Sequence, residues 1–285
     1  MKIAISSDST CAISQAEAKE MGIYILPLNV IVDGKEYHDD ITIHQKELNK
    51  MMRGGSKIQT STPTPVEIEN YFNKIFEAGF DKVIHFTISS KLSSMNNLFN
   101  LTCKNLYGDK VVVIDSLGVC SFMGNLVRRA KRLADEGKSV DEIVNNVNKY
   151  INKDEIFFVP ESLTFLKNGG RVSPTVALIG NMLGIKPFLK FYNGEILKQG
   201  TVRTYKKAFN EMIEIYKGMN LKPEEYEFHV VEFDSNDAAD EVIKMLQDAF
   251  PGFNIERTPI SINVCAHAGP GTIGFGRCTR YDIDL

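Results

Sequence analysis

The stretch Val83-Ile84-His85-Phe86-Thr87-Ile88-Ser89-Ser90-Lys91-Leu92-Ser93-Ser94 decides the fold. Its first six residues are mostly apolar, which predicts a buried strand, and a helix is expected over residues 92–106. Ser93 and Ser94 would then lie near the N-terminus of that helix, where backbone N–H groups lack intrahelical partners and the dipole is positive. Such a position binds an anion without a charged side chain. The pattern therefore indicates a protein that holds a carboxylate or a phosphate.

Three further clusters of small polar side chains follow predicted strands: Asp8-Ser9-Thr10, Thr60-Ser61-Thr62 and Asp115-Ser116. Strands are expected at residues 3–5, 24–32, 83–88 and 111–114, with helices between them. The last strand is wholly apolar, as expected for a parallel strand covered on both faces. This alternation predicts a parallel α/β/α sandwich, in which ligands bind beyond the carboxyl ends of the strands.

The pattern changes near residue 154. Strands are expected at residues 155–160, 228–231 and 260–264, and amphipathic helices at 204–216 and 236–250. Tyr192-Asn193-Gly194 between two apolar runs predicts a hairpin. We therefore expect two domains: residues 1–154 form the parallel sandwich, and residues 155–285 form an α+β domain with a mixed sheet.

Composition excludes several classes of protein. The chain of 285 residues has a net charge of −3, so nucleic acid is not expected as a partner. No apolar run reaches the ~18 residues of a membrane span, and the N-terminus lacks the features of a signal peptide. The five cysteines form no CxxC pair and the histidines show no metal-ligand spacing, which indicates a reducing cytoplasm and no metal or cofactor.

Several motifs allow both a structural and a functional interpretation. The glycines of Gly269-Pro270-Gly271-Thr272-Ile273-Gly274 lack the βαβ context of a dinucleotide site, so a tight turn is favoured. His267, expected after the strand at 260–264, is either a structural imidazole or a donor to an anionic ligand. Arg171 and Arg203 either form surface ion pairs or face a carboxylate or phosphate.

A serine hydrolase or acyltransferase is the leading alternative to a binding protein. Ser93 could pair with His267 and either Asp8 or Asp115, but Lys91-Leu92-Ser93-Ser94-Met95 lacks both glycines of a nucleophile elbow.

The apolar stretch at residues 175–186 is either a core helix or the lining of a cavity.

An ordered set of motifs resembles the DegV family of bacterial fatty-acid-binding proteins. The matching segments span nearly the whole chain: Ser7-Asp8-Ser9-Thr10, Pro27-Leu28, Thr60-Ser61, Ile88-Ser89-Ser90-Lys91-Leu92-Ser93, Ile114-Asp115-Ser116, Leu166-Lys167-Asn168-Gly169-Gly170-Arg171-Val172-Ser173, Ile185-Lys186-Pro187, Val202-Arg203-Thr204 and Ala266-His267 with Gly269 and Gly271. Each segment alone is common, whereas the ordered set is specific.

The resemblance implies a non-catalytic protein that holds a long-chain fatty acid, such as palmitate, stearate or oleate, between two domains. It implies that Thr60, Ser61, Ser93, Ser94 and His267 surround the carboxylate. It further implies an acyl tunnel lined by Val176, Ile179 and Leu183, and a separate fatty acid kinase that phosphorylates the bound ligand. Arg171 and Arg203 would face that kinase or the phosphate, and a monomer is expected.

This chain departs from the family pattern beside the paired serines. The family has Leu-Ser-Gly-Thr where this chain has Leu92-Ser93-Ser94-Met95, which places a side chain at the helix start and replaces a hydroxyl with a flexible apolar group. A third hypothesis, a kinase subunit that binds a small polyol, follows from the similar architecture of dihydroxyacetone kinases. The apolar stretch from Val176 disfavours the small polar pocket that this hypothesis requires.

Overall fold

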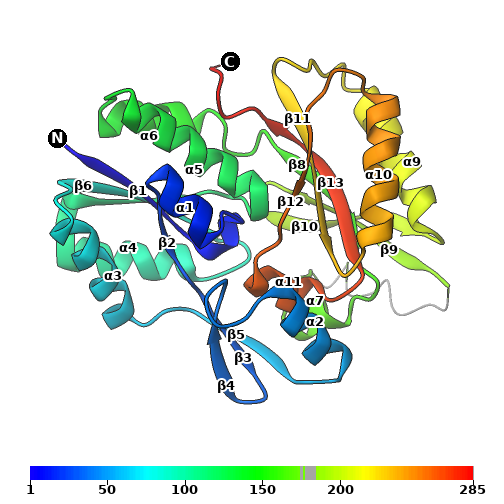
Figure 1. Ribbon diagram of the computed structural model, residues 1–285, viewed down its shortest axis with the longest axis horizontal. Coiled ribbons are helices and arrows are strands. Elements are labelled where there is room, and N and C mark those ends of the chain that lie inside the picture. Colours follow the sequence, from blue (N-terminus) through cyan, green and yellow to red (C-terminus); the bar gives the residue numbers. More distant parts are fainter. Residues whose placement is uncertain (174–175, 177–183, 285) are drawn as a thin grey trace.

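The computed structural model describes residues 1–173, 176 and 184–284. Its N-terminal part contains a four-stranded parallel sheet in the order β2-β1-β6-β7 (Figure 1). The strands are β1 (Ile3–Asp8), β2 (Tyr24–Leu26), β6 (Lys82–Thr87) and β7 (Val111–Asp115). A short 3-10 turn, η1 (Ser9–Cys11), follows β1, and another, η2 (Gly108–Lys110), precedes β7.

Helices cover both faces of this sheet because successive strand side chains point to opposite sides. Val83 packs in one core with α3 (Pro65–Glu77) and α4 (Met95–Tyr107). The next residue, Ile84, packs in another core with α1 (Gln15–Met21), α5 (Cys120–Asp135) and α6 (Val140–Asn148). The two sets of helices lie on opposite sides of the sheet in Figure 1. The predicted parallel sandwich is therefore confirmed.

The prediction of one strand over residues 24–32 is wrong. Pro27-Leu28 separates β2, which pairs with β1, from β3 (Asn29–Val32), which belongs to a different sheet. This second sheet is antiparallel in the order β4-β3-β5, with β4 (Lys35–His38), β5 (Ile58–Ser61) and the neighbouring helix α2 (Gln45–Arg53). Proline has no N–H for a ladder, so the chain changes sheets there. Thr60-Ser61 therefore lies in an antiparallel strand and not at the end of a parallel one.

A six-stranded mixed sheet contains every strand that the structure describes after residue 154. Its order is β10-β9-β8-β13-β11-β12, and the β11–β12 pair alone is parallel within the described residues. The strands are β8 (Glu155–Val159), β9 (Lys186–Tyr192), β10 (Glu195–Val202), β11 (Tyr226–Phe233), β12 (Ile255–Thr258) and β13 (Thr272–Thr279). The predicted hairpin around Asn193 is confirmed as the β9–β10 turn, and the mixed sheet completes the expected fold class.

One face of this sheet is covered and the other faces the N-terminal part. Phe157 packs under α9 (Tyr205–Lys217) and α10 (Asn236–Ala249). Its neighbour Phe158 points the other way, into the core that also contains side chains of the N-terminal part. The two halves therefore meet at the face of β8, β9 and β11 that α9 and α10 do not cover, which is called the open face of the sheet. The expected boundary at residue 154 remains a prediction, although no sheet of the described chain includes strands from both sides of it.

The prediction of a strand at residues 260–264 is also wrong. The segment forms helix α11 (Ile262–Ala268), because Ser261 accepts a hydrogen bond from the Val264 N–H as N-cap. Helix α11 contacts α2, β3, β5 and the short helix α7 (Thr164–Asn168), so it lies between the two halves (Figure 1). In the part of the chain that the structure describes, no helix has both the length and the apolar character needed to cross a bilayer.

Candidate functional site

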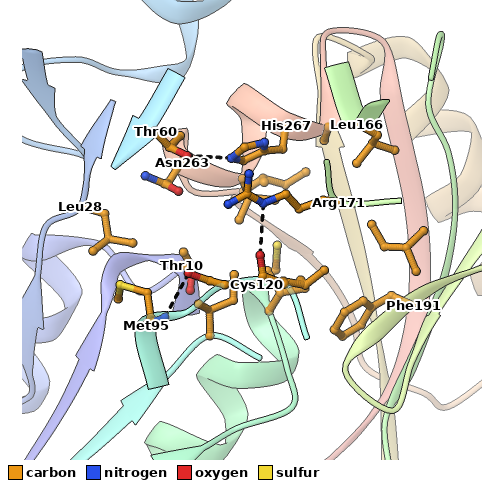
Figure 2. A pocket seen from close by; sticks show the side chains of 18 of the residues that line it. Thr10, Leu28, Thr60, Met95, Cys120, Leu166, Arg171, Phe191, Asn263 and His267 are labelled. Atoms are coloured by element: carbon orange, nitrogen blue, oxygen red, sulfur yellow. Dashed lines mark hydrogen bonds between the residues drawn. The ribbon is translucent and has the colours of Figure 1, made fainter. Parts of the chain in front are cut away.

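A cavity with about 1120 Å³ of empty space, including its solvent-open part, lies where the two halves meet. Its wall includes side chains from β5, from the loop between β6 and α4, from the start of α5, from the open face of the six-stranded sheet and from α11. Figure 2 shows these side chains converging from both halves.

Polar side chains gather at one part of the wall. The structure brings together six of the residues singled out from the sequence: Thr60, Ser61, Ser93, Ser94, His267 and Arg171. Their backbone positions come from strand β5, from the N-terminus of α4, from α11 and from the loop after α7. Segments that are far apart in the sequence therefore supply one group of donors.

His267 is held by a hydrogen bond of 2.8 Å between its Nε2 and the Thr60 Oγ1 (Figure 2). Burial, and then the positive charge of Arg171, lowers the pKa of His267 to about 4. The imidazole is thus neutral at pH 7, with one nitrogen a donor and the other an acceptor. Because Nε2 and Oγ1 bond each other, one proton of the pair lies between them and the other is free for an anion. The free donor is the Thr60 O–H if Nε2 carries the imidazole proton, and the Nδ1 N–H if it does not.

Helix α11 places His267 because its N-terminus is fixed by groups from the N-terminal half. Asp39 accepts hydrogen bonds from the Ile262 N–H at 3.1 Å and from the Ser9 hydroxyl at 2.8 Å. The Asn263 amide, which lines the cavity, donates to the Asn29 carbonyl at 3.1 Å. Burial raises the pKa of Asp39 to about 6. Sequence reasoning missed Asp39 and Asn263, and an acidic residue distant from a helix N-terminus gives no local signal that would have found them.

Arg171 brings a partly buried positive charge to the cavity. Its Nε donates to the Leu92 carbonyl at 3.1 Å, which ties the loop after α7 to the loop that carries Ser93 (Figure 2). Burial lowers the pKa of Arg171, and within the described residues no carboxylate lies within ion-pair distance of its guanidinium. A guanidinium without an acidic partner in a cavity favours an anionic ligand, which would supply the missing counter-charge.

Ser93 and Ser94 lie at the helix N-terminus, as predicted, although α4 begins at Met95 and not at residue 92. The Ser93 Oγ accepts a hydrogen bond of 3.3 Å from the Met95 N–H, and Ser94 is the exposed N-cap residue. No hydrogen bond links Ser93 to His267 among the described side chains, since the imidazole Nε2 bonds Thr60 instead. The nucleophile–base pair of a serine hydrolase is therefore not assembled in this arrangement.

The remainder of the wall is mainly apolar. Ile156 and Phe158 of β8, Phe191 of β9, Ile196 of β10 and Val231 of β11 line it from the open face of the six-stranded sheet. Figure 2 shows Phe191 on the opposite side of the cavity from Thr60. The cavity is thus amphiphilic, because neutral donors and one cation share it with a larger apolar surface, part of which lies across from Thr60.

Other residues singled out from the sequence lie elsewhere. Arg203 is exposed between β10 and α9 and is not part of the described cavity wall. Val176 is buried in the core next to the cavity but does not line it. Ile179 and Leu183 lie outside the described residues. Among the residues that the structure places, no group of three or more His, Cys, Asp or Glu side chains could hold a metal ion.

The fold and the site together define an α/β protein with an internal amphiphilic cavity at the junction of two sheet systems. The model of the DegV family, which is described as a family of uncharacterised proteins, matches residues 2–280, and the chain belongs to this family. A DegV domain-containing protein of Caldanaerobacter subterraneus subsp. tengcongensis is 32% identical over 273 residues, which cover 96% of this chain and 97% of the relative.

Solved structures of the family share the fold. A DegV family protein from Thermus thermophilus, described by its fatty acid binding, superposes with a TM-score of 0.89 at 27% identity and covers 98% of this chain and 100% of its own. A protein from Eubacterium ventriosum, described as binding stearic acid, superposes with a TM-score of 0.86 at 25% identity and covers 99% of each chain.

Proposed function

We propose that this protein binds a long-chain fatty acid in the cavity, with the carboxylate facing Thr60, Ser93, His267 and Arg171. The observation that carries the proposal is the amphiphilic wall, in which an unpaired guanidinium and neutral donors lie opposite the apolar face of the six-stranded sheet. The relatives that are described as fatty-acid-binding proteins support the same ligand class.

The energetics of the wall suit this ligand. Each buried CH₂ group contributes ~0.8 kcal/mol, so a chain of sixteen or eighteen carbons needs few polar contacts for tight binding. A carboxylate beside the partly buried Arg171 would regain the charge pairing that the guanidinium otherwise lacks. A small polyol would leave the apolar wall without a partner, which is why the fatty acid is favoured.

The second part of the proposal is that the protein presents the carboxylate to a separate kinase, in the cytoplasm where ATP is available. Neutral hydroxyls and a neutral imidazole hold a carboxylate without protonating it, so its oxygens remain nucleophilic. Arg203 lies exposed on the surface, where it could contact a partner. We expect a kinase to phosphorylate the bound fatty acid. We expect Arg203→Ala to weaken this phosphorylation while leaving the fatty acid affinity unchanged. Phosphorylation at the wild-type rate with Arg203→Ala would contradict a role for this arginine in contacting the kinase.

The first experiment is to extract the purified protein with organic solvent under denaturing conditions and to analyse the extract by mass spectrometry. We expect one long-chain fatty acid per protein chain, and its identity gives the chain length that the cavity selects. Absence of lipid, together with no binding of added palmitate by the delipidated protein, would sink the proposal. Esterase activity that depends on Ser93 would then become the next hypothesis to test.

Thr60→Val tests the polar end of the cavity with a side chain of nearly the same shape. The hydroxyl that bonds His267 and donates to the ligand is lost, so palmitate affinity should fall about fivefold to tenfold, as expected for ~1–1.5 kcal/mol. The measurement is a fluorescence titration with delipidated protein. Thr62→Val, at an exposed position on the same wall, is the matched control and should change the affinity less than twofold. Equal effects of the two substitutions would contradict a specific role for Thr60.

A further inference from the structure

The absence of a side chain at Gly169 makes room for the ring of His267. Gly169 is the C-cap of α7 and has a φ of −75°, a conformation that any residue adopts. A Cβ built at this position would lie 2.2 Å from the His267 Nδ1 and 3.0 Å from its Cε1. Glycine is therefore required here by the close approach of the imidazole and not by the backbone conformation.

A second ring-on-glycine contact runs in the opposite direction between the same two helices. The Phe165 ring of α7 lies over Gly269, where an added Cβ would be 2.4 Å from the Phe165 Cδ2. Each helix thus places one ring on a glycine of the other, His267 on Gly169 and Phe165 on Gly269. This reciprocal packing leaves the imidazole little freedom to rotate away from Thr60, which it bonds through Nε2 at 2.8 Å.

The backbone of Gly169 also contacts the positive charge of the site. The Gly169 carbonyl accepts a hydrogen bond from the Arg171 guanidinium, whose Nε simultaneously donates to the Leu92 carbonyl. One residue therefore touches the imidazole with its Cα and the guanidinium with its carbonyl oxygen. Displacing Gly169 would move both groups at once.

We propose that Gly169 is a positioning residue that holds His267 and Arg171 together as one anion-binding unit. The inference rests on the proposed function, because it assigns the carboxylate as the group that this unit recognises. The contacts that Gly169 makes with the site are to the imidazole and the guanidinium, so it should affect binding of the head group and not of the acyl chain. A test must therefore measure head-group binding and acyl-chain binding separately.

The test compares Gly169→Ala with the matched control Gly170→Ala in binding palmitate and 1-hexadecanol, which has the same chain length and no carboxylate. Gly170 has a φ of +70° and nothing within 4 Å of an added Cβ, so its alanine variant is strained without crowding the site. We expect Gly169→Ala to lower palmitate affinity at least tenfold and hexadecanol affinity less than twofold. Gly170→Ala should leave the ratio of the two affinities unchanged. A parallel loss of both ligands in Gly169→Ala would overturn the proposal.

A double-mutant cycle with His267→Ala keeps the test decisive if Gly169→Ala folds poorly. Removing the ring frees the space that the new methyl group needs, so Gly169→Ala should have less than a threefold further effect on palmitate affinity in that background. An undiminished effect would show that Gly169 acts through something other than His267.

The imidazole signals of His267 in NMR spectra give a readout that needs no ligand. They should shift in Gly169→Ala and stay unchanged in Gly170→Ala. Unshifted signals in Gly169→Ala overturn the positioning role, whereas a wild-type protein that binds no palmitate contradicts the proposed function alone.

Discussion

At the scale of single residues, His85 shows how burial determines a protonation state. It lies fully buried in β6, where its Nδ1 bonds the Ser6 hydroxyl at 2.7 Å and its ring stacks on Phe99 at 4.3 Å. Its Nε2 has no hydrogen-bond partner among the described residues. Burial lowers the pKa of His85 from 6.5 to about 3, because a charged imidazole would lose its hydration.

This depressed pKa predicts a loss of stability in acid. Between pH 6.5 and 3 the unfolded chain binds a proton at His85 that the folded protein does not bind, so the free energy of unfolding falls as the pH is lowered through this window. Between pH 7 and pH 5 the wild-type protein should lose about 2 kcal/mol more than His85→Leu, given ~1.4 kcal/mol per pH unit. Urea unfolding of both proteins at the two pH values measures the difference. Identical pH dependence would show that His85 titrates normally.

At the scale of elements, two hairpins with the same turn conformation differ in what their tips touch. Asn193-Gly194 joins β9 to β10 with φ values of 51° and 81°, and Asp33-Gly34 joins β3 to β4 with 50° and 83°. The Gly194 carbonyl accepts a hydrogen bond of 2.7 Å from the Ser89 hydroxyl, next to an ion pair between Lys91 and Glu195. The β9–β10 tip is therefore docked on the loop that carries Ser93.

The matched substitutions Gly194→Ala and Gly34→Ala separate turn strain from docking. Both incur the cost of a positive φ, roughly 1 kcal/mol. An added Cβ at Gly194 would also lie 2.5 Å from the Ser89 Oγ, whereas nothing lies within 4 Å at Gly34. We expect Gly194→Ala to destabilise the protein by roughly 1–2 kcal/mol more than Gly34→Ala in urea unfolding. Equal destabilisation would mean that the hairpin tip is not docked.

At the scale of the whole molecule, α2 is linked by charge to the far sheet. Arg53 donates to Asp234 at 2.7 Å and to Glu161 at 2.9 Å, in the loops that follow β11 and β8. The Arg53 side chain is 47% exposed and the two carboxylates are 31% and 45% exposed. Water and salt therefore screen these ion pairs, which limits their energy although they join the two halves.

Arg53→Gln should lower the free energy of unfolding by less than about 1 kcal/mol at low ionic strength. In 1 M NaCl, where the Debye length is ~3 Å, the difference from wild type should largely disappear. Lys217→Gln is the control, because its ion pair with Glu214 lies within α9 and does not join the halves. A loss above 2 kcal/mol for Arg53→Gln that persists in high salt would show that the contact is not mainly a screened ion pair.

Local patterns were enough to predict much of the N-terminal half. Apolar runs such as Val111–Ile114 and cap residues such as Ser139 with Glu142 specify a strand or a helix start within a few residues. Local patterns were insufficient to predict β13, because Gly274 and Gly276 lower its strand propensity. Pairing with β8 on one side and β11 on the other overrides this low propensity. They also failed at α11, where Asp39, more than 200 residues away, accepts from the helix N-terminus.

The sequence by itself determined the parallel sheet, the mixed sheet and the position of Ser93 and Ser94 at a helix N-terminus, because periodicity and caps act between near neighbours. Only the tertiary structure decided that Thr60 meets His267 across 207 residues and that Arg171 lies in the cavity while Arg203 does not. Those outcomes depend on which faces of the elements bury against each other. No single segment encodes this choice of faces. The chosen arrangement is the one that leaves the least apolar surface of the whole chain exposed to water.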